Sequence, residues 1–385
     1  MNIVQQAGPD CILMTRKLIV HVGQTKTGTT AIQSYLSAHR VDLLQYGVFY
    51  PTNINHNYLV KKILNFSPAS ATEETIVSPK GKSGKFELPE MALAELSSND
   101  KLFRPHILRL RNILRKSEPE VVILSAELFA VRQPDRVVDA IERCFGEFFD
   151  EIHYILYVRP HIGFMKAKFS EHLKNGWISC EAEDFIKKEL QLPIQKIDLV
   201  KSWLSVSAKC TVRPFIRSLW HNENLIDDFR KVAGLDFLPD WQEAVANESL
   251  SLRALATIKV FQDLSKIENI WIRRSIGWEI QKILNEQASG QKAFAFSRSE
   301  AELIAQHVRK DAEAVDEALS LSGAGFVSDL ENTVARSPEI AEKLADQEMD
   351  PDVMAALMRI VEDFVTAKGF DWNEYFDAKY ISQIN

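Results

Sequence analysis

The stretch HVGQTKTGTT, His21–Thr30, decides the fold of this chain. The β-branched run KLIVHV at 17–22 leads into it and predicts a buried strand. The segment that follows, TTAIQSYLSAH, places Ile32 and Leu36 one turn apart on one face of a helix. A loop before a helix N-terminus presents backbone amides and the positive end of the helix dipole, which favour an anion. Two glycines at this spacing also fit a simple strand-to-helix turn, but strand, lysine, hydroxyls and helix together favour an anion-binding loop.

The position of the lysine separates this loop from an ordinary ATP or GTP loop. In the pattern GxxxxGK[ST] a lysine follows the second glycine and reaches the terminal phosphates, and the next hydroxyl binds Mg²⁺. Gly23 and Gly28 have that spacing, but Thr29 stands in the lysine position. Lys26 lies between the glycines instead, beside the hydroxyls of Thr27, Thr29 and Thr30. Such a loop suits a compact 5′-phosphate and the atom that bridges it to a transferred group, as in a sulfuryl donor, without a triphosphate tail or a metal.

Four short apolar runs predict the strands of a parallel sheet. They are KLIVHV (17–22), VVIL (121–124), HYILYV (153–158) and CTVRPF (210–215). Their near-continuous apolar character is typical of strands buried on both faces, and helical patterns lie between them. This alternation predicts an α/β fold, a three-layer P-loop-like arrangement in which helices cover a parallel sheet and ligands bind at the carboxyl ends of the strands.

Three regions follow from this pattern. We expect residues 1–16 to be a flexible N-terminal extension and residues 17–235 to form the α/β core with the donor site. Helical signals dominate afterwards, among them a capping box at Ser297–Glu300, so residues 236–385 are predicted to form a helical C-terminal region packed on the core. Between 67 and 89 the chain is rich in Ser, Pro, Gly and Lys, which predicts an exposed loop.

Composition and charge exclude several classes of protein. The 385 residues carry a formal net charge of −7, which argues against a general nucleic-acid binder because such proteins need a basic face. The four cysteines are scattered and lack the spacing of a zinc site or a disulfide framework. No apolar run reaches the ~20 residues that span a bilayer, and the first residues lack the pattern of a secretory signal. These features predict a cytoplasmic protein with no transmembrane segment and no metal site.

Four ordered stretches resemble the bacterial sulfotransferase family, whose members use 3′-phosphoadenosine-5′-phosphosulfate (PAPS) on a P-loop-like α/β fold. The first stretch is HVGQTKTGTTAIQSYL, which starts at His21. ILSAELF (123–129) resembles a second strand that ends in Ser-x-Glu. YILYVRPHIGFMKAKFSEHLKNG (154–176) resembles the segment that holds the 3′-phosphate of the donor. NESLS (247–251) resembles a motif near the start of the C-terminal helices.

The resemblance implies roles for the residues at matching positions. The 5′-phosphosulfate loop would comprise Gly23, Lys26, Thr27, Gly28, Thr29 and Thr30. Arg159 matches the arginine that binds the 3′-phosphate, and its planar fork suits phosphate oxygens. The family has a serine eight positions later, where this chain has Ala167. We expect Ser170, or one of the neighbours Lys166 and Lys168, to replace the lost hydrogen bond.

Two residues are candidates for the base that removes the acceptor proton. His56 lies 30 residues beyond Lys26, in a region where related enzymes place a glutamate or histidine, and an imidazole accepts protons near neutral pH. Glu127 follows the second strand at the edge of the sheet that collects ligands, where it could act as the base, anchor the acceptor or orient Lys26. His21, inside the first strand, is expected to be packed and hydrogen-bonded there.

Together these features predict a sulfotransferase that moves a sulfuryl group from PAPS to a hydroxyl by direct in-line transfer. The resemblance implies a carbohydrate or glycolipid acceptor. One alternative is a P-loop kinase, against which Lys26 and the Ser-Ala-Glu end of the second strand both argue. The other is a nucleotide-binding protein of the same fold that has lost turnover, which Ala167 favours. The expected partners are a nucleotide donor and a saccharide, and not nucleic acid.

Overall fold

The computed structural model describes residues 15–51, 57–65, 107–241, 250–264 and 293–347, with isolated positions between 273 and 281 and between 355 and 366. The chain divides into two compact units. The first comprises residues 1–158 and 199–246, and the second comprises residues 159–198 and 247–385. The contiguous core of residues 17–235 that the sequence suggests is therefore interrupted, since 159–198 group with the C-terminal helices. His56, the 67–89 loop and all but two residues of the 1–16 extension lie outside the described residues.

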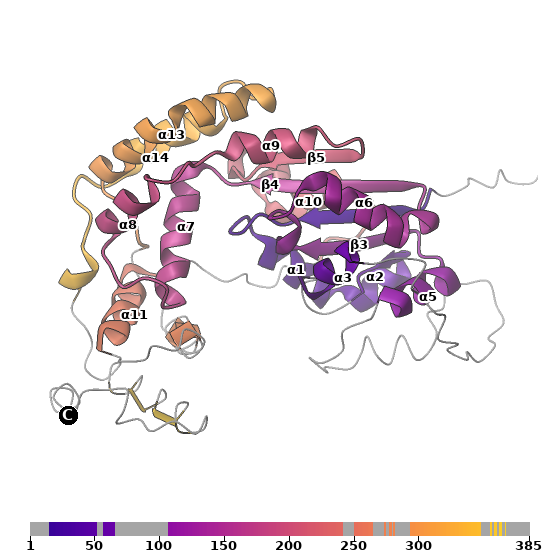
Figure 1. Cartoon of the computed structure of the whole chain (residues 1–385), viewed down its shortest axis with the longest axis horizontal. Coiled ribbons are helices and arrows are strands. Elements are labelled where there is room, and N and C mark those ends of the chain that lie inside the picture. The colour runs from indigo at the N-terminus through magenta and orange to yellow at the C-terminus, as the bar shows by residue number, and fades with distance from the viewer. Residues whose placement is uncertain are drawn as a thin grey trace, which may run out of the picture. The chain divides into compact units, whose positions relative to one another are not determined.

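The first unit contains a five-stranded parallel sheet of order β2-β3-β1-β4-β5 (Figure 1). Its strands are β1 (Lys17–Val22), β2 (Val48–Phe49), β3 (Val121–Ala126), β4 (Glu151–Val158) and β5 (Lys209–Pro214). The four strands expected from the sequence are confirmed, with ends that differ by at most two residues. All neighbouring strands are parallel because a helical connection carries the chain back before each new strand.

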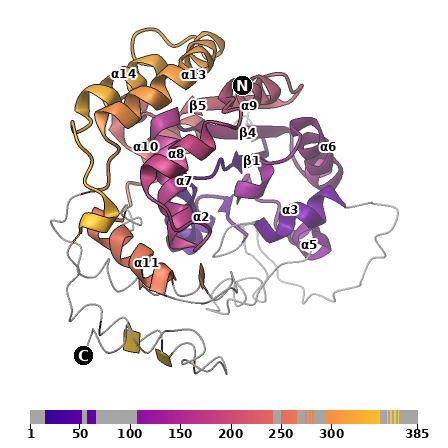
Figure 2. The ribbon, with the colours of Figure 1, turned by 60° about the vertical axis from the view of Figure 1, so that its left-hand side comes forward.

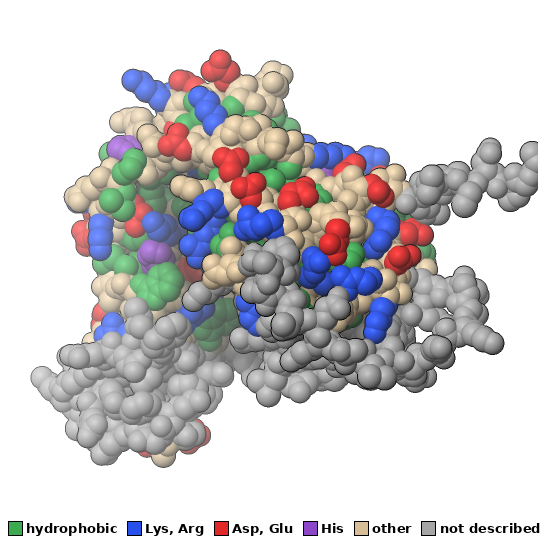
Figure 3. Space-filling model, turned by 45° about the vertical axis from the view of Figure 1, so that its right-hand side comes forward, with side chains coloured by type: hydrophobic (Ala, Val, Ile, Leu, Met, Phe, Trp, Pro, Cys, Tyr) green, Lys and Arg blue, Asp and Glu red, His purple; other side chains and the backbone are tan. Residues whose placement is uncertain are grey.

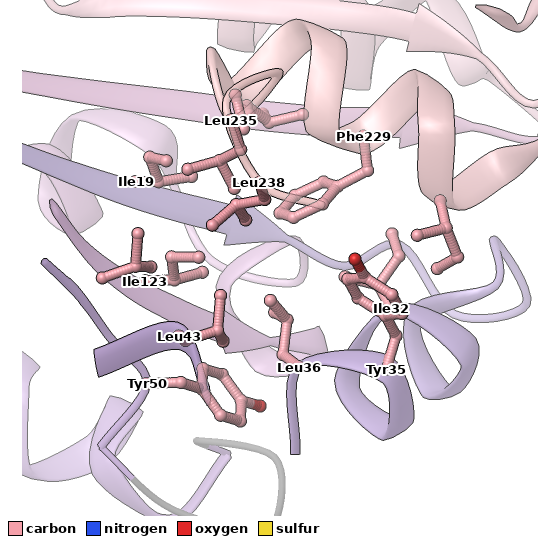
Figure 4. Packing of buried hydrophobic residues seen from close by; sticks show 14 of the residues in the cluster. Ile19, Ile32, Tyr35, Leu36, Leu43, Tyr50, Ile123, Phe229, Leu235 and Leu238 are labelled. Carbon is pink, nitrogen blue, oxygen red and sulfur yellow. The ribbon is translucent and has the colours of Figure 1, made fainter. Parts of the chain in front are cut away.

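Helices cover both faces of this sheet, which gives three layers. The first face packs against α1 (Thr29–Ala38), α2 (Arg40–Gln45) and α10 (Leu225–Ala233). Figure 4 shows side chains of these helices packed around Ile19 and Ile123 of the sheet. The helices on the other side are α3 (Asn57–Leu64), α5 (Ile107–Ser117), α6 (Pro134–Phe145) and α9 (Lys196–Leu204). There the ring of Trp203 on α9 lies 5.7 Å from that of Tyr154 on β4.

The order in which strands are added to the sheet reverses at its centre: β2 and β3 lie on one side of β1, and β4 and β5 lie on the other. β1 pairs with β3 on one side and β4 on the other, so Val22 at its carboxyl end lies between Ala126 and Leu156. In open parallel sheets, the crevice at such a reversal is where ligands bind. The loop that begins at Gly23 starts at this point.

The second unit is helical in its described part. It contains α7 (His161–Lys174), α8 (Ala182–Glu189), α11 (Leu252–Leu264), α13 (Arg298–Ala318) and α14 (Phe326–Arg336). α13 and α14 lie side by side (Figures 1 and 2). The capping box at the start of α13 is confirmed, because Ser297 and Glu300 exchange hydrogen bonds. Across the described segments, no helix combines the length and apolar character needed to cross a membrane.

Candidate functional site

The loop between β1 and α1 has two residues in the left-handed conformation. The amide of Gly23 donates to Ala126 O at 3.1 Å, so the β1–β3 ladder continues into the start of the loop. Lys26 then has a φ of 69° and Gly28 a φ of 70°. A left-handed residue reverses the local path of the chain, and few residues other than glycine adopt it without strain. The lysine that the sequence singles out is therefore held in an unusual backbone conformation.

Both glycines of the loop are required by close packing. A Cβ on Gly23 would stand 2.7 Å from the Thr29 hydroxyl and 3.3 Å from the Glu127 Cα. A Cβ on Gly28 would overlap the side chain of Leu225 on α10. The spacing of these glycines thus reflects a compact loop packed between β3 and α10.

The threonines of the loop play different parts. Thr27 donates its hydroxyl to Gln24 O at 2.7 Å, and Thr29 donates to the same oxygen at 3.4 Å. These two hydroxyls brace the loop from within. Thr30 is exposed, and its hydroxyl has no hydrogen-bond partner among the described residues. Of the three predicted hydroxyl donors, Thr30 is the one that is exposed to solvent.

The N-terminus of α1 has the electrostatic character of an anion site. Gly28 is its N-cap, no side chain caps it, and its first turn has no acidic residue. By contrast, Asn224 caps α10 and Ser297 caps α13 with side-chain oxygens. An uncapped N-terminus leaves amides available to oxygen atoms of a phosphate or sulfate, and the helix dipole adds to the attraction. Lys26 lies two residues before this N-terminus.

A buried polar network lies beneath the loop. His21 Nδ1 lies 2.8 Å from Ser125 Oγ, and Gln33 Nε2 donates to the same hydroxyl at 3.0 Å. The ring of His21 also meets the edges of Tyr157 and Phe229. Burial lowers the pKa of His21 to about 3, so the ring is neutral. His21 is packed and hydrogen-bonded as expected, and it links β1 to β3 instead of facing the loop as an acid or base.

Glu127 lies against the loop in the first unit. It begins a short 3₁₀ turn, Glu127–Phe129, directly after β3, and it is half-buried. The next amide, that of Leu128, donates to Asn57 Oδ1 at 2.9 Å, which ties the start of α3 to the same edge of the sheet. Of the two candidate bases, Glu127 is therefore beside Gly23. His56 immediately precedes α3 and lies outside the described residues.

A cluster of cations lies in the second unit. Arg159 directly follows the last residue of β4, and its Nε would stand 3.4 Å from a Cβ added to Gly163 on the first turn of α7. The guanidinium group thus runs along the helix over a position without a side chain. Lys166 follows on the same face, because it is one further turn along. Burial lowers the pKa of Lys166, and the charge of Arg159 lowers it further, so the two cations are close.

Lys196, at the start of α9, completes the cluster. Its side chain is 4% exposed, and its ammonium group lies 3.9 Å from the centroid of the Phe164 ring. Burial lowers its pKa to about 7, with Asp311 acting in the opposite direction and Arg159 in the same direction. In the described part of the chain no carboxylate lies within ion-pair distance of this amine. Burying a cation without a counter-charge is costly, and an anion bound at the cluster would offset that cost.

Asp311 is occupied by other donors. His161 Nε2 lies 2.6 Å from Asp311 Oδ2, and the amides of Lys196 and Ile197 donate to the same carboxylate at 2.9 and 3.1 Å. Burial alone raises the pKa of Asp311, but these hydrogen bonds outweigh it and lower the pKa. The carboxylate therefore fixes the start of α9, and it holds the backbone of Lys196 in place beside α7.

The polar residues around Ala167 differ in whether their side chains are already engaged by other groups. Ser170 donates its hydroxyl to Lys166 O at 3.1 Å, within α7. Lys168 forms an ion pair with Glu189. Lys166 is the neighbour of Ala167 that lies beside Arg159. The structure therefore favours a lysine over Ser170 as the group that adds to Arg159 at this cluster.

Sequence reasoning missed Lys196, Gln33 and Ser125 as members of these clusters. The Ser-x-Glu pattern contains Ser125, so that pattern was a usable signal. Gln33 follows Ile32 in the first turns of α1 and reads as an ordinary polar helix residue. Lys196 has no local signal, because a lysine at a helix start is usually exposed.

The chain was compared with protein-family models, curated proteins and solved structures, and no match was found. The arguments for function therefore come from the residues of this chain and their geometry.

Proposed function

We propose that the protein is a sulfotransferase that moves a sulfuryl group from PAPS to a hydroxyl acceptor. The observation that carries this proposal is the loop itself. Lys26 lies between Gly23 and Gly28, and the loop leads into a helix N-terminus with no side-chain cap. The lysine that reaches the terminal phosphates in an ATP or GTP loop is absent from its usual position after the second glycine. The loop therefore suits a 5′-phosphosulfate better than a triphosphate.

The loop would bind the charged end of the donor. Amides at the start of α1 and the Thr30 hydroxyl would donate to oxygens of the phosphosulfate. Lys26 would neutralise the charge that develops on the leaving 5′-phosphate oxygen, and electrostatic stabilisation of this kind is a large contribution to catalysis. Both groups act without a change in the fold, because Thr27 and Thr29 already brace the loop.

The transfer would exchange one sulfur–oxygen bond for another. The acceptor oxygen forms a bond to sulfur, the bond from sulfur to the 5′-phosphate oxygen breaks, and that oxygen keeps the electron pair. Glu127 would accept the proton of the acceptor hydroxyl, a role that its position against Gly23 supports. His56 stays the rival base, because the sequence favours it for the same role.

The 3′-phosphate would be bound by the cationic cluster of the second unit. The resemblance assigns this group to Arg159, and the burial of Lys196 near Arg159 supports an anion there. Lys166 and Lys196 would supply the attraction that the family's serine supplies elsewhere. Charge-assisted hydrogen bonds are stronger than neutral ones, so the exchange of a hydroxyl for an ammonium group need not weaken the site.

A turnover experiment tests the proposal. Purified protein is incubated with PAPS and a panel of saccharides and glycolipids, and formation of 3′-phosphoadenosine-5′-phosphate (PAP) and of sulfated product is followed by mass spectrometry. We expect product with at least one acceptor, none from Lys26→Ala, and wild-type rates from Lys201→Ala, which removes an exposed lysine on α9.

Other outcomes would assign a different function. Phosphate transfer from ATP with Mg²⁺, and none of sulfate from PAPS, would show a kinase. Binding of PAP without turnover on any acceptor would favour the non-catalytic nucleotide-binding protein, the reading that Ala167 supports. Full activity in Lys26→Ala would remove that lysine from the mechanism.

A further inference from the structure

A cavity of about 490 Å³ lies on the first unit, beside α6. One wall is the end of α3, at Leu64 and Asn65, and the facing wall is the first three turns of α6 with the residues before it. Its volume lies within the ~300–1,000 Å³ of typical small-ligand pockets. None of the residues given for its lining belongs to the loop after β1 or to the cationic cluster.

The cavity has an excess of positive charge. Its lining includes Arg132, Arg136 and Arg143, and a single carboxylate, Asp139. The three arginines are exposed, and within the described segments none forms an ion pair. Arg136, Asp139 and Arg143 recur on one face of α6, opposite the buried apolar face that packs on the sheet. The residues that line the cavity therefore carry a net positive charge, although Asp135 and Glu142 are also exposed on the polar side of α6.

Helix α3 runs from the cavity to the edge of the sheet that carries Glu127. The start of α3 is held there by the hydrogen bond from the Leu128 amide to Asn57 Oδ1. The eight residues of α3 span about 12 Å at 1.5 Å per residue. On the other wall, Val131 follows Glu127 by one turn of chain. An extended molecule with one group at Glu127 could thus have further groups in the cavity.

The spacing of the arginines favours an extended ligand over a compact one. Arg136 and Arg143 are seven residues apart, which is about 10 Å along a helix. Two anionic groups about that far apart could each meet one guanidinium group, so a chain with repeated anionic groups suits this spacing. Arginine is also suited to carboxylate and sulfate, since its planar fork binds two oxygens at once.

We propose that this cavity, which we call the arginine pocket, is a binding site for an acidic oligosaccharide. The role of the arginine pocket as a distal subsite for the acceptor rests on the proposed sulfotransferase function. The binding of the saccharide to the pocket does not depend on that function. Nucleic acid is the less favoured polyanion. A nucleic-acid binder needs an extended basic face, whereas Figure 3 shows acidic and basic side chains interspersed on the face that it draws.

Calorimetry with a heparin-derived tetrasaccharide tests this inference without any nucleotide present. We expect it to bind wild-type protein, and a neutral tetrasaccharide such as maltotetraose not to bind. Arg136→Gln and Arg143→Gln should each weaken binding about fivefold. Lys201→Gln, which removes one exposed charge from α9, should leave it unchanged. Asp139→Asn should tighten binding, because it removes the one negative charge from the wall.

Three results would overturn the inference. They are equal affinity of wild type and the double variant Arg136→Gln, Arg143→Gln, equal binding of the neutral tetrasaccharide, and tighter binding of a single-stranded oligonucleotide of equal charge. All affinities are compared at one salt concentration, because polyanion binding depends on it. Thermal unfolding of each variant checks that the fold is intact. Failure of the protein to bind PAP would leave this inference standing, so the two proposals fail separately.

Discussion

Gly23 lies directly against Glu127, so that a Cβ on the glycine would stand 3.3 Å from the Glu127 Cα. The contact arises because the Gly23 amide donates to Ala126 O, which extends the pairing of β1 and β3 by one step. The first residue of the loop and the candidate base thus meet through the register of two neighbouring strands. The geometry of the loop and the position of the Glu127 backbone therefore depend on each other.

We expect Gly28→Ala to destabilise the first unit. An alanine in the left-handed region costs about 1–2 kcal/mol, and its Cβ would also overlap Leu225. Gly234→Ala is the matched control, since Gly234 has a φ of 72° in the same unit and a Cβ there would lie 3.5 Å from Lys17 Nζ. Urea unfolding should show a loss that exceeds that of Gly234→Ala by roughly 1 kcal/mol or more. Equal losses would mean that packing against α10 does not restrict this position.

Two variants should distinguish the effect of the Lys26 backbone conformation on stability from the effect of its charge on sulfate transfer. Lys26→Gly removes the ammonium group and suits the φ of 69°, so it should unfold at the wild-type temperature or higher while sulfate transfer is lost. Lys26→Arg keeps the charge and should retain a measurable part of the turnover. Transfer by Lys26→Gly at the wild-type rate would contradict a catalytic role for the ammonium group.

We expect Lys196→Met to stabilise the second unit at neutral pH and to weaken binding of a 3′-phosphate. Because its pKa is lowered to about 7, the folded protein carries an unfavourable buried charge below that pH. The free-energy cost that the buried Lys196 charge imposes on the wild-type fold should therefore shrink as pH rises from about 7 toward the ordinary pKa of lysine, ~10.4. The difference in unfolding free energy between variant and wild type should fall over this range.

The binding part is measured by comparing PAP with AMP, which lacks the 3′-phosphate. We expect wild type to bind PAP more tightly than AMP, and Lys196→Met to reduce this ratio of affinities about tenfold. Affinity for AMP itself should stay the same. A variant that keeps the full preference would show that Lys196 is a packing residue only.

Asp329, on α14, should oppose anion binding at Arg159. Burial raises the pKa of Asp329 to about 6, although the charges of Arg159 and Arg336 act to lower it. A raised carboxyl pKa contributes stability that is complete below about pH 4 and is lost as pH rises through about 6. Asp329→Asn should therefore be more stable than wild type at pH 8, and the difference should disappear near pH 4. The same variant should bind PAP more tightly, and unchanged stability at pH 8 would contradict a buried charge.

The sheet and the loop were predictable because their signals are local. KLIVHV and HYILYV are strands, and the two glycines frame a loop that leads into α1. Local signals also indicated that His21 is packed. β2 has two residues, too few to give a periodic pattern of its own.

The cationic cluster and the arginine pocket were not predictable, since they depend on residues far apart in the chain. Asp311 reaches His161 across 150 positions and holds Lys196 from α13. The arginine pocket needs the end of α3 beside α6, although each helix alone reads as an ordinary amphipathic helix. The grouping of residues 159–198 with the C-terminal helices likewise has no signal in the order of strands and helices.

The most direct test of the central claim is the thermal unfolding of wild-type protein with PAP, with ATP and Mg²⁺, and with neither. A ligand at about 100 times its dissociation constant stabilises the folded state by about 2.7 kcal/mol. We expect PAP to raise the unfolding temperature by several degrees and ATP with Mg²⁺ to leave it unchanged. A rise with ATP and Mg²⁺ alone, or no rise with PAP at millimolar concentration, would contradict the account.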